Sequence, residues 1–169
     1  MLRWIYLLIG LTGAILMSQF PAFHQQYLQR LGGHVNELRL SVSSLDERAA
    51  NADLDRYAYV RRLIDNADPV VSAEGDALMD MVARYIELSA SLKRLSSLPG
   101  YAVAGAMVIE VDREIGIATM EEFEPSVTLN LLGIGHALVG FFIGYLGSMG
   151  ILSLVMWRRV PVKPEGELQ

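Results

Sequence analysis

The chain has 169 residues, of which 52% are hydrophobic, and its mean hydropathy is +0.32. A soluble domain of this length usually has a smaller apolar share, so the composition favours a membrane protein. The formal net charge of −5 argues against nucleic acid as a partner, and the absence of cysteine excludes disulfides and thiolate chemistry.

Residues 1–23 predict a first transmembrane helix with a short cytoplasmic N-terminus. The run Trp4–Phe23 contains no Asp, Glu, Lys or Arg, and a helix of roughly 20 residues spans the hydrocarbon core of a bilayer. A cleaved signal peptide is the alternative, but its cleavage site requires small residues at positions −3 and −1. Cleavage after Ala22 would put Phe20 at −3, so an uncleaved anchor is favoured. Pro21 should either start a new helix or bend a continuous one.

Residues 24–126 predict an extracytoplasmic, periplasmic helical domain that is acidic, with ten Lys and Arg against seventeen Asp and Glu. Its first helix carries apolar residues spaced alternately by three and four from Leu28 to Ala52, which is typical of a coiled-coil seam. Gly32-Gly33 interrupts this seam and predicts a local weakness or bend. The candidate packing residues of the seam are Leu31, Val35, Leu38, Val42 and Leu45.

Two further helices are expected in the middle of this domain. One begins near Asp53 and ends before Pro69, because the residue that precedes a proline avoids helical geometry. The next has Ser72 as its N-cap, since a serine hydroxyl can accept from the free amides of the first turn. A second heptad pattern runs along this helix over Leu78–Leu95 and stops in a turn cluster at residues 96–100.

Residues 101–109 form an apolar stretch that is too short to span a membrane. A helix is the favoured interpretation, while an interfacial segment or a strand stays open. Asp112 is expected to cap a last amphipathic helix that continues to Phe123.

Residues 127–157 predict a second transmembrane helix, since they contain no Asp, Glu, Lys or Arg up to Trp157. Small residues recur along it at spacings of four, three, four and three, which allows close helix–helix packing. They are Gly133, Ala137, Gly140, Gly144 and Gly147. The first helix offers Gly10 and Ala14 in return. Whether this association occurs within one chain or between chains is left open.

The basic flanks predict the orientation of both helices. Arg3 precedes the first helix, and the tail 158–169 follows the second with three more basic residues. Positive charge in short loops stays in the cytoplasm, so both termini are placed there. Trp4 and Trp157 then lie at the same interface, where indole rings are enriched.

The two predicted membrane borders resemble a known family. The first border reads Ser18-Gln19-Phe20-Pro21-x-Phe23-x-Gln25-Gln26-Tyr27-x-Gln29-Arg30-Leu31-Gly32-Gly33-His34, and the second reads Glu121-x-Phe123-x-Pro125. They resemble a domain-of-unknown-function family of short two-span proteins from proteobacterial inner membranes. The resemblance implies a two-span topology and a bacterial envelope location. It implies no activity and no catalytic residue.

His136 is the sharpest candidate for chemistry, because ionisable residues inside a membrane span are functional candidates by default. An interfacial hydrogen bond is favoured over a proton-sensing or ligand role. His24 and His34 lack the spacing of metal ligands, and the carboxylates are scattered. We therefore predict no catalytic residue, cofactor or metal.

The sequence predicts an all-α membrane protein in which two transmembrane helices flank an extracytoplasmic helical bundle with coiled-coil character. We expect a non-enzymatic structural or accessory protein of the bacterial inner membrane. Its expected partners are membrane lipid, further copies in a homo-oligomer and a larger envelope complex. The alternative is a periplasmic sensor-like helical module that passes a signal to a separate partner, and an enzyme is disfavoured.

Overall fold

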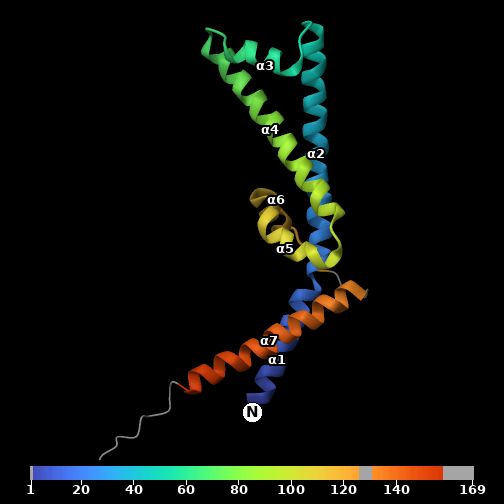
Figure 1. The fold of residues 1–169 in the computed structure, drawn as a ribbon, viewed down its shortest axis with the longest axis vertical. Helices are drawn as coiled ribbons and strands as arrows, with labels where there is room; N and C mark the ends of the chain where they lie inside the picture. Colours follow the sequence, from blue (N-terminus) through green and yellow to red (C-terminus); the bar gives the residue numbers. More distant parts are fainter. Residues whose placement is uncertain (1, 126–130, 158–169) are drawn as a thin grey trace, which may run out of the picture. The chain divides into compact units, whose positions relative to one another are not determined.

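The computed structural model describes residues 2–125 and 131–157, and these residues form helices and no strand. The helices are α1 (Leu2–Ser18), α2 (Phe20–Asn51), α3 (Arg56–Ile64), α4 (Pro69–Ser97), α5 (Gly100–Glu110), α6 (Arg113–Glu121) and α7 (Leu131–Trp157) (Figure 1). The chain divides into two compact units, one that contains α1 and α7 and one that covers residues 23–123. The predicted all-α class is confirmed.

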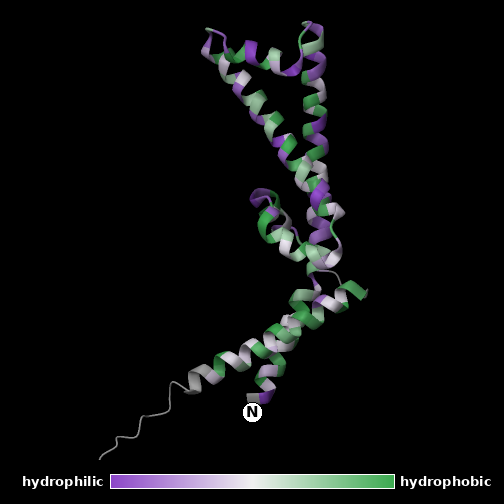
Figure 2. Cartoon of the chain, in the orientation of Figure 1, coloured by the Kyte–Doolittle hydropathy of each residue, from purple (hydrophilic) through white to green (hydrophobic). Residues whose placement is uncertain are grey.

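Two helical stretches are long and apolar enough to cross a membrane, one that includes α1 and one over Leu131–Ser153 of α7. Figure 2 shows that hydrophobic residues dominate α7, whereas hydrophilic residues recur along α2 and α4. Only Gln19 separates α1 from α2, and Pro21 lies in the first turn of α2. A proline is tolerated there because the first amides of a helix have no intrahelical acceptor. Pro21 therefore lies at the start of a new helix. This is the first of the two predicted alternatives, the other being a bend in a continuous helix.

The residue 23–123 unit has its hydrophobic core where α2, α3 and α4 meet. Figure 1 shows α3 linking the ends of the two long helices α2 and α4. The buried members of the core are Val42 and Leu45 from α2, Val60 from α3, and Leu78 and Val82 from α4. Val42, Leu45 and Leu78 are positions of the predicted heptad patterns, whereas Val82 is not, and the predicted positions Met81 and Tyr85 are only partly buried against this core.

The seam of α2 is buried at its two ends and half-buried between them. Leu31 and Leu45 are fully buried, and Val42 is buried. Val35 and Leu38 are only half-buried. The helix continues without a break through Gly32-Gly33.

The predicted N-cap of α4 is wrong. Asp68 is the N-cap, and its carboxylate accepts from the Val70 amide at 2.9 Å. Pro69 lacks an N–H and has a φ suited to the first helical position, so the helix starts directly after Asp68. Ser72 lies one turn inside, where its hydroxyl donates to the Ile64 carbonyl at 2.8 Å.

The predicted start of α3 is also early. Asp53 has a φ of 55°, which is left-handed geometry outside a helix. Asp55 is the N-cap, and its carboxylate accepts from the Ala58 amide at 3.0 Å. The helix ends at Ile64, short of the predicted end next to Pro69.

The later helices agree better with the sequence pattern. Residues 101–109 are helical, as predicted, within α5. Asp112 caps α6 by accepting from the Ile115 amide at 3.0 Å, as predicted, although the helix ends at Glu121 rather than Phe123.

Truncation of a seam residue tests this core. Leu45→Ala should lower the free energy of unfolding by about 2–5 kcal/mol, because it removes a fully buried side chain. Leu40→Ala on the same helix is the matched control, since Leu40 is 56% exposed. Urea unfolding of the full chain in detergent, followed by circular dichroism, measures both. Equal effects of the two substitutions would contradict the assignment of the core.

Candidate functional site

The helices α1 and α7 pack through glycines with their backbones in close approach. A Cβ built on Gly144 would lie 2.7 Å from the carbonyl oxygen of Ile9 and 3.2 Å from the Cα of Gly10. A Cβ built on Gly140 would clash with the carbonyl oxygen of Gly13. Neither position accepts a side chain without a shift of backbone, so the small residues are what permits this contact.

The other small residues of α7 differ in their placement. Gly133 is buried and Ala137 is half-buried on α7. Gly147 is exposed, and none of the described atoms lies within 4 Å of a Cβ built on it. Ser148 is the buried residue of that turn. Gly147 therefore does not contribute to packing within the chain, and its role between chains stays a prediction.

On α1, the contact uses a residue that the sequence analysis missed. Ala14 is half-buried, but Gly13 provides the closest approach to α7. The three-residue spacing from Gly10 to Gly13 was the available signal, since positions three and four apart share a helix face.

His136 makes two local contacts within the same unit. Its Nδ1 lies 2.8 Å from the carbonyl oxygen of Leu132, and its ring stacks on Phe20 with centroids 5.4 Å apart. These contacts agree with the hydrogen-bonding interpretation. A proton-sensing or ligand role stays a prediction.

Leucine substitutions test the glycine contact. Gly140→Leu or Gly144→Leu should destabilise the α1–α7 pair by about 1–3 kcal/mol, because the added side chain overpacks the contact. Gly147→Leu is the control, since that position faces open space. Thermal unfolding in detergent measures the difference. A Gly147→Leu variant as unstable as Gly140→Leu would contradict the contact.

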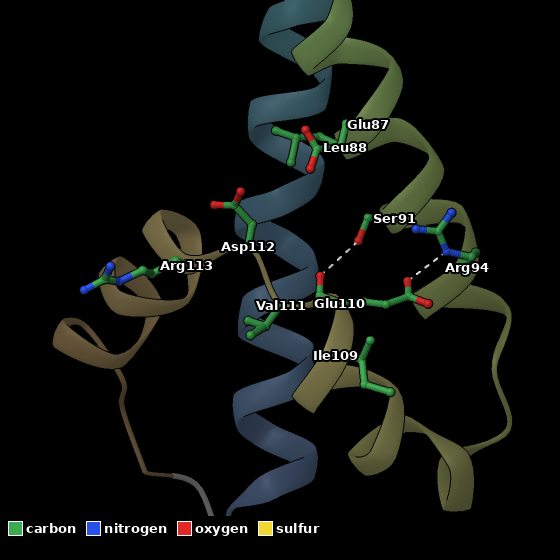
Figure 3. A pocket seen from close by; sticks show the side chains of 9 residues that line it. All are labelled: Glu87, Leu88, Ser91, Arg94, Ile109, Glu110, Val111, Asp112 and Arg113. Atoms are coloured by element: carbon green, nitrogen blue, oxygen red, sulfur yellow. Dashed lines mark hydrogen bonds and ion pairs between the residues drawn. The ribbon is translucent and has the colours of Figure 1, made fainter.

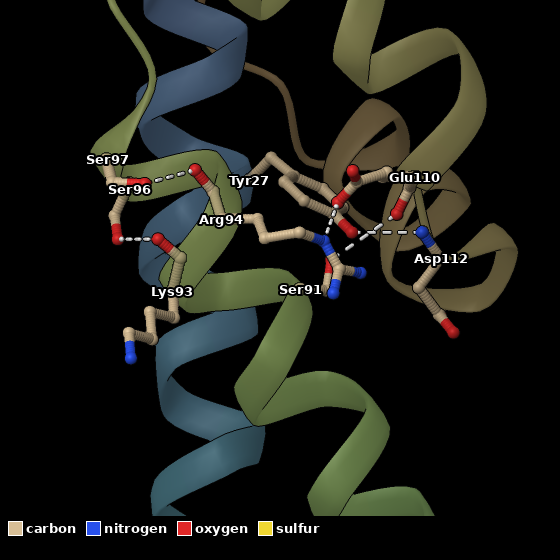
Figure 4. Close-up of polar contacts among 8 residues, drawn as sticks. All are labelled: Tyr27, Ser91, Lys93, Arg94, Ser96, Ser97, Glu110 and Asp112. Carbon is tan, nitrogen blue, oxygen red and sulfur yellow. Dashed lines mark hydrogen bonds and ion pairs between the residues drawn. The ribbon is translucent and has the colours of Figure 1, made fainter.

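The second site is a polar junction in the residue 23–123 unit. Tyr27 of α2 is fully buried, and its hydroxyl accepts a hydrogen bond from the Asp112 amide at 3.0 Å (Figure 4). The Asp112 carboxylate forms an ion pair with Arg84 of α4, with Nη1 and Oδ2 2.6 Å apart. The connection between α5 and α6 is therefore tied to both long helices.

Burial and pairing shift the protonation equilibria at this junction. Burial raises the pKa of the Tyr27 hydroxyl. Burial alone would also raise the pKa of Asp112, but hydrogen bonds from Arg84 and from the Ile115 amide hold it below its ordinary value. Asp112 is therefore ionised at neutral pH, as both of its bonds require.

A pocket of about 320 Å³ lies beside the junction, between α4 and the end of α5 (Figure 3). Arg94 donates through Nε to the Glu110 carboxylate at 2.8 Å, and the Ser91 hydroxyl lies 3.5 Å from the Glu110 carbonyl oxygen (Figure 4). Covalent catalysis by serine needs a base as the partner of its hydroxyl, and Ser91 donates to a carbonyl instead. Arg94 and Glu110 of this pocket therefore bind each other, and Asp112 binds Arg84.

The start of α2 is also tied to the end of α6. Arg30 forms an ion pair with Glu122. The rings of Phe23 and Phe123 pack edge to face with centroids 5.7 Å apart. The first and last parts of the residue 23–123 unit are therefore in contact with each other. Among the described residues, no group of three or more His, Cys, Asp or Glu is arranged to hold a metal ion.

Most of the chain matches one protein family. Residues 1–160 match the family described as "Protein of unknown function (DUF2937)". The chain belongs to the DUF2937 family. This confirms the resemblance to a domain-of-unknown-function family. No curated protein and no solved structure shows a significant similarity to this DUF2937 chain.

Sequence reasoning found Asp112 of the DUF2937 junction as a helix cap but not as an ion-pair partner. Its partner Arg84 lies on another helix, and no local spacing connects the two residues. Tyr27 was visible only as part of the family resemblance. Arg94 and Glu110 likewise lie on different helices, so only the fold brings them together.

The junction predicts a pH dependence. Because the pKa of Asp112 in the folded DUF2937 chain is below its ordinary value of 3.8, its contribution to stability is complete above that pH. It is lost as the pH falls through the lowered folded-state pKa. Asp112→Asn should therefore flatten the loss of stability below about pH 4, and Asp80→Asn, at an exposed position of α4, is the matched substitution control. Urea unfolding at several pH values measures this, and equal slopes in wild type and Asp112→Asn would refute it.

Proposed function

We propose that this protein is a non-enzymatic structural or accessory protein anchored in a bacterial inner membrane. In this proposal α1 and α7 cross the bilayer, both termini are cytoplasmic and residues 24–126 are periplasmic. The protein acts through association of its helices, with itself and with a larger envelope complex.

The observation that carries this proposal is the way in which α1 and α7 pack against each other. The contact between them buries small residues, while large apolar side chains point outward. Leu8 is 64% exposed and Leu16 is 68% exposed on α1, and Ile143 is 64% exposed on α7. In water such a surface would be a large apolar patch, whereas in lipid it is the expected exterior of a helix pair.

Self-association is supported by the part of the α2 seam that its own chain leaves open. Val35 and Leu38 are half-buried, whereas Leu31 and Leu45 on either side of them in the seam are fully buried. A second α2 placed against this segment would bury the seam along its whole length, as in a coiled coil. Because the glycine contact is already used within the chain, we assign the contact between copies to α2.

A charge placed in the open part of the seam tests self-association. Wild-type protein in lipid nanodiscs or mild detergent should have the native mass of a dimer or a larger oligomer. Leu38→Glu should shift it to the monomer, because an unpaired charge in an apolar helix contact is destabilising. Ser43→Glu is the matched control, since Ser43 is an exposed residue of α2. A monomeric wild-type protein, or an oligomer that Leu38→Glu leaves intact, would contradict the proposal.

A further inference from the structure

The helix α5 has an apolar face that no other described element covers. Tyr101, Val108 and Ile109 are 85%, 83% and 85% exposed, more than any other large apolar side chain described between residues 23 and 123. Val103 and Met107, on the opposite side of α5, are buried. The helix is therefore apolar on both faces, and only one of them is packed.

The segment that carries most of this face is uncharged. No charged residue occurs in the sequence between Arg94 and Glu110. Ile109 lies at the end of this run, next to Glu110, whereas Tyr101 and Val108 lie within it. Single exposed apolar residues are normal, whereas several on one face of an uncharged run indicate a partner.

Chain connectivity favours a lipid surface as that partner. The end of α5 is followed by Asp112, whose amide binds Tyr27, and Tyr27 is seven residues after the first residue of α2. An α-helix rises 1.5 Å per residue, so this attachment lies about 10 Å along α2 from its start. Only Gln19 separates that start from α1, which we propose to lie in the bilayer.

The dimensions and chemistry of α5 also fit this partner. Eleven residues make a helix of about 16 Å, which is too short to cross the ~30 Å hydrocarbon core but long enough to lie in its surface. Tyr101 is one of the two residue types enriched at the boundary between headgroups and acyl chains. The acidic character of the domain disfavours anionic headgroups, so a zwitterionic surface suits it better.

We propose that α5 is an interfacial helix that inserts Tyr101, Val108 and Ile109 into the outer surface of the same membrane that α1 and α7 cross. This inference rests on the proposed function, since it needs α1 in the bilayer. It fixes the level of the polar junction at the headgroups, because the connection between α5 and α6 carries Asp112. The unit would then be held to the membrane at three points rather than two.

Spin labels at single cysteines test this proposal in the full chain, which has no cysteine of its own. Val108→Cys is labelled in phosphatidylcholine vesicles, and its collision rates with oxygen and with a water-soluble nickel chelate are compared. Oxygen concentrates in lipid and the chelate in water, so the ratio at residue 108 should be severalfold higher than at Ala77→Cys. Ala77 is an exposed residue of α4 and serves as the control in water.

Leu138→Cys on α7 separates the two proposals. A lipid-like ratio at residues 138 and 108 supports the inference. A lipid-like ratio at 138 with a water-like ratio at 108 overturns the interfacial helix and leaves the membrane anchor intact. A water-like ratio at 138 overturns the proposed function itself. A second copy on this face would bring two labels at residue 108 close together and cause spin–spin broadening. This broadening would disappear when labelled protein is diluted with unlabelled protein, and that result would also overturn the inference.

Discussion

The membrane assignment follows from one constraint, which is the close approach of the α1 and α7 backbones. Small residues lie between the two helices, and large apolar residues lie around them. At Gly140 and Gly144 the backbone of α7 comes so near to α1 that a single added carbon has no room. In water, helices associate by burying large apolar side chains, but in lipid that driving force is absent and close backbone packing replaces it. This packing therefore supports the proposal that a bilayer surrounds the pair.

The residue 23–123 unit follows a different rule. Its core is a conventional cluster of Leu and Val side chains from three helices, and charged residues occupy its exterior. Further buried apolar residues lie outside that cluster, among them Leu31, Leu95 and Ile115, and polar contacts are added near the start of α2. Tyr27, Arg84 and Asp112 each bind a group on a different segment, so three helices are connected by directional bonds at one point. Such a junction specifies how α5 and α6 attach, because a shifted arrangement would leave the buried Tyr27 hydroxyl and the half-buried Asp112 carboxylate without partners.

Much of this could be predicted from the sequence, because helical periodicity and membrane hydropathy are local signals. The heptad patterns of α2 and α4 located the core residues Leu45 and Leu78, and the uncharged runs located α1 and α7. Helix starts were less predictable: Asp68 and Ser72 are both good N-caps, and the choice between them depends on Pro69. Contacts between distant segments gave no local signal. Arg84 and Asp112 are ordinary surface residues until the fold brings them together, and the close approach at Gly13 depends on the rotation of α1 about its own axis.

The most direct test of the membrane assignment is the accessibility of single cysteines to a membrane-impermeant maleimide in bacterial cells whose outer membrane has been made permeable. The account predicts that a cysteine introduced at Ala58, an exposed position of α3, is labelled in intact spheroplasts. A cysteine introduced at position 168 should be labelled only after the inner membrane is disrupted. Labelling of the tail in intact spheroplasts, or protection of position 58, would contradict a chain that crosses the membrane twice with its acidic domain outside the cytoplasm.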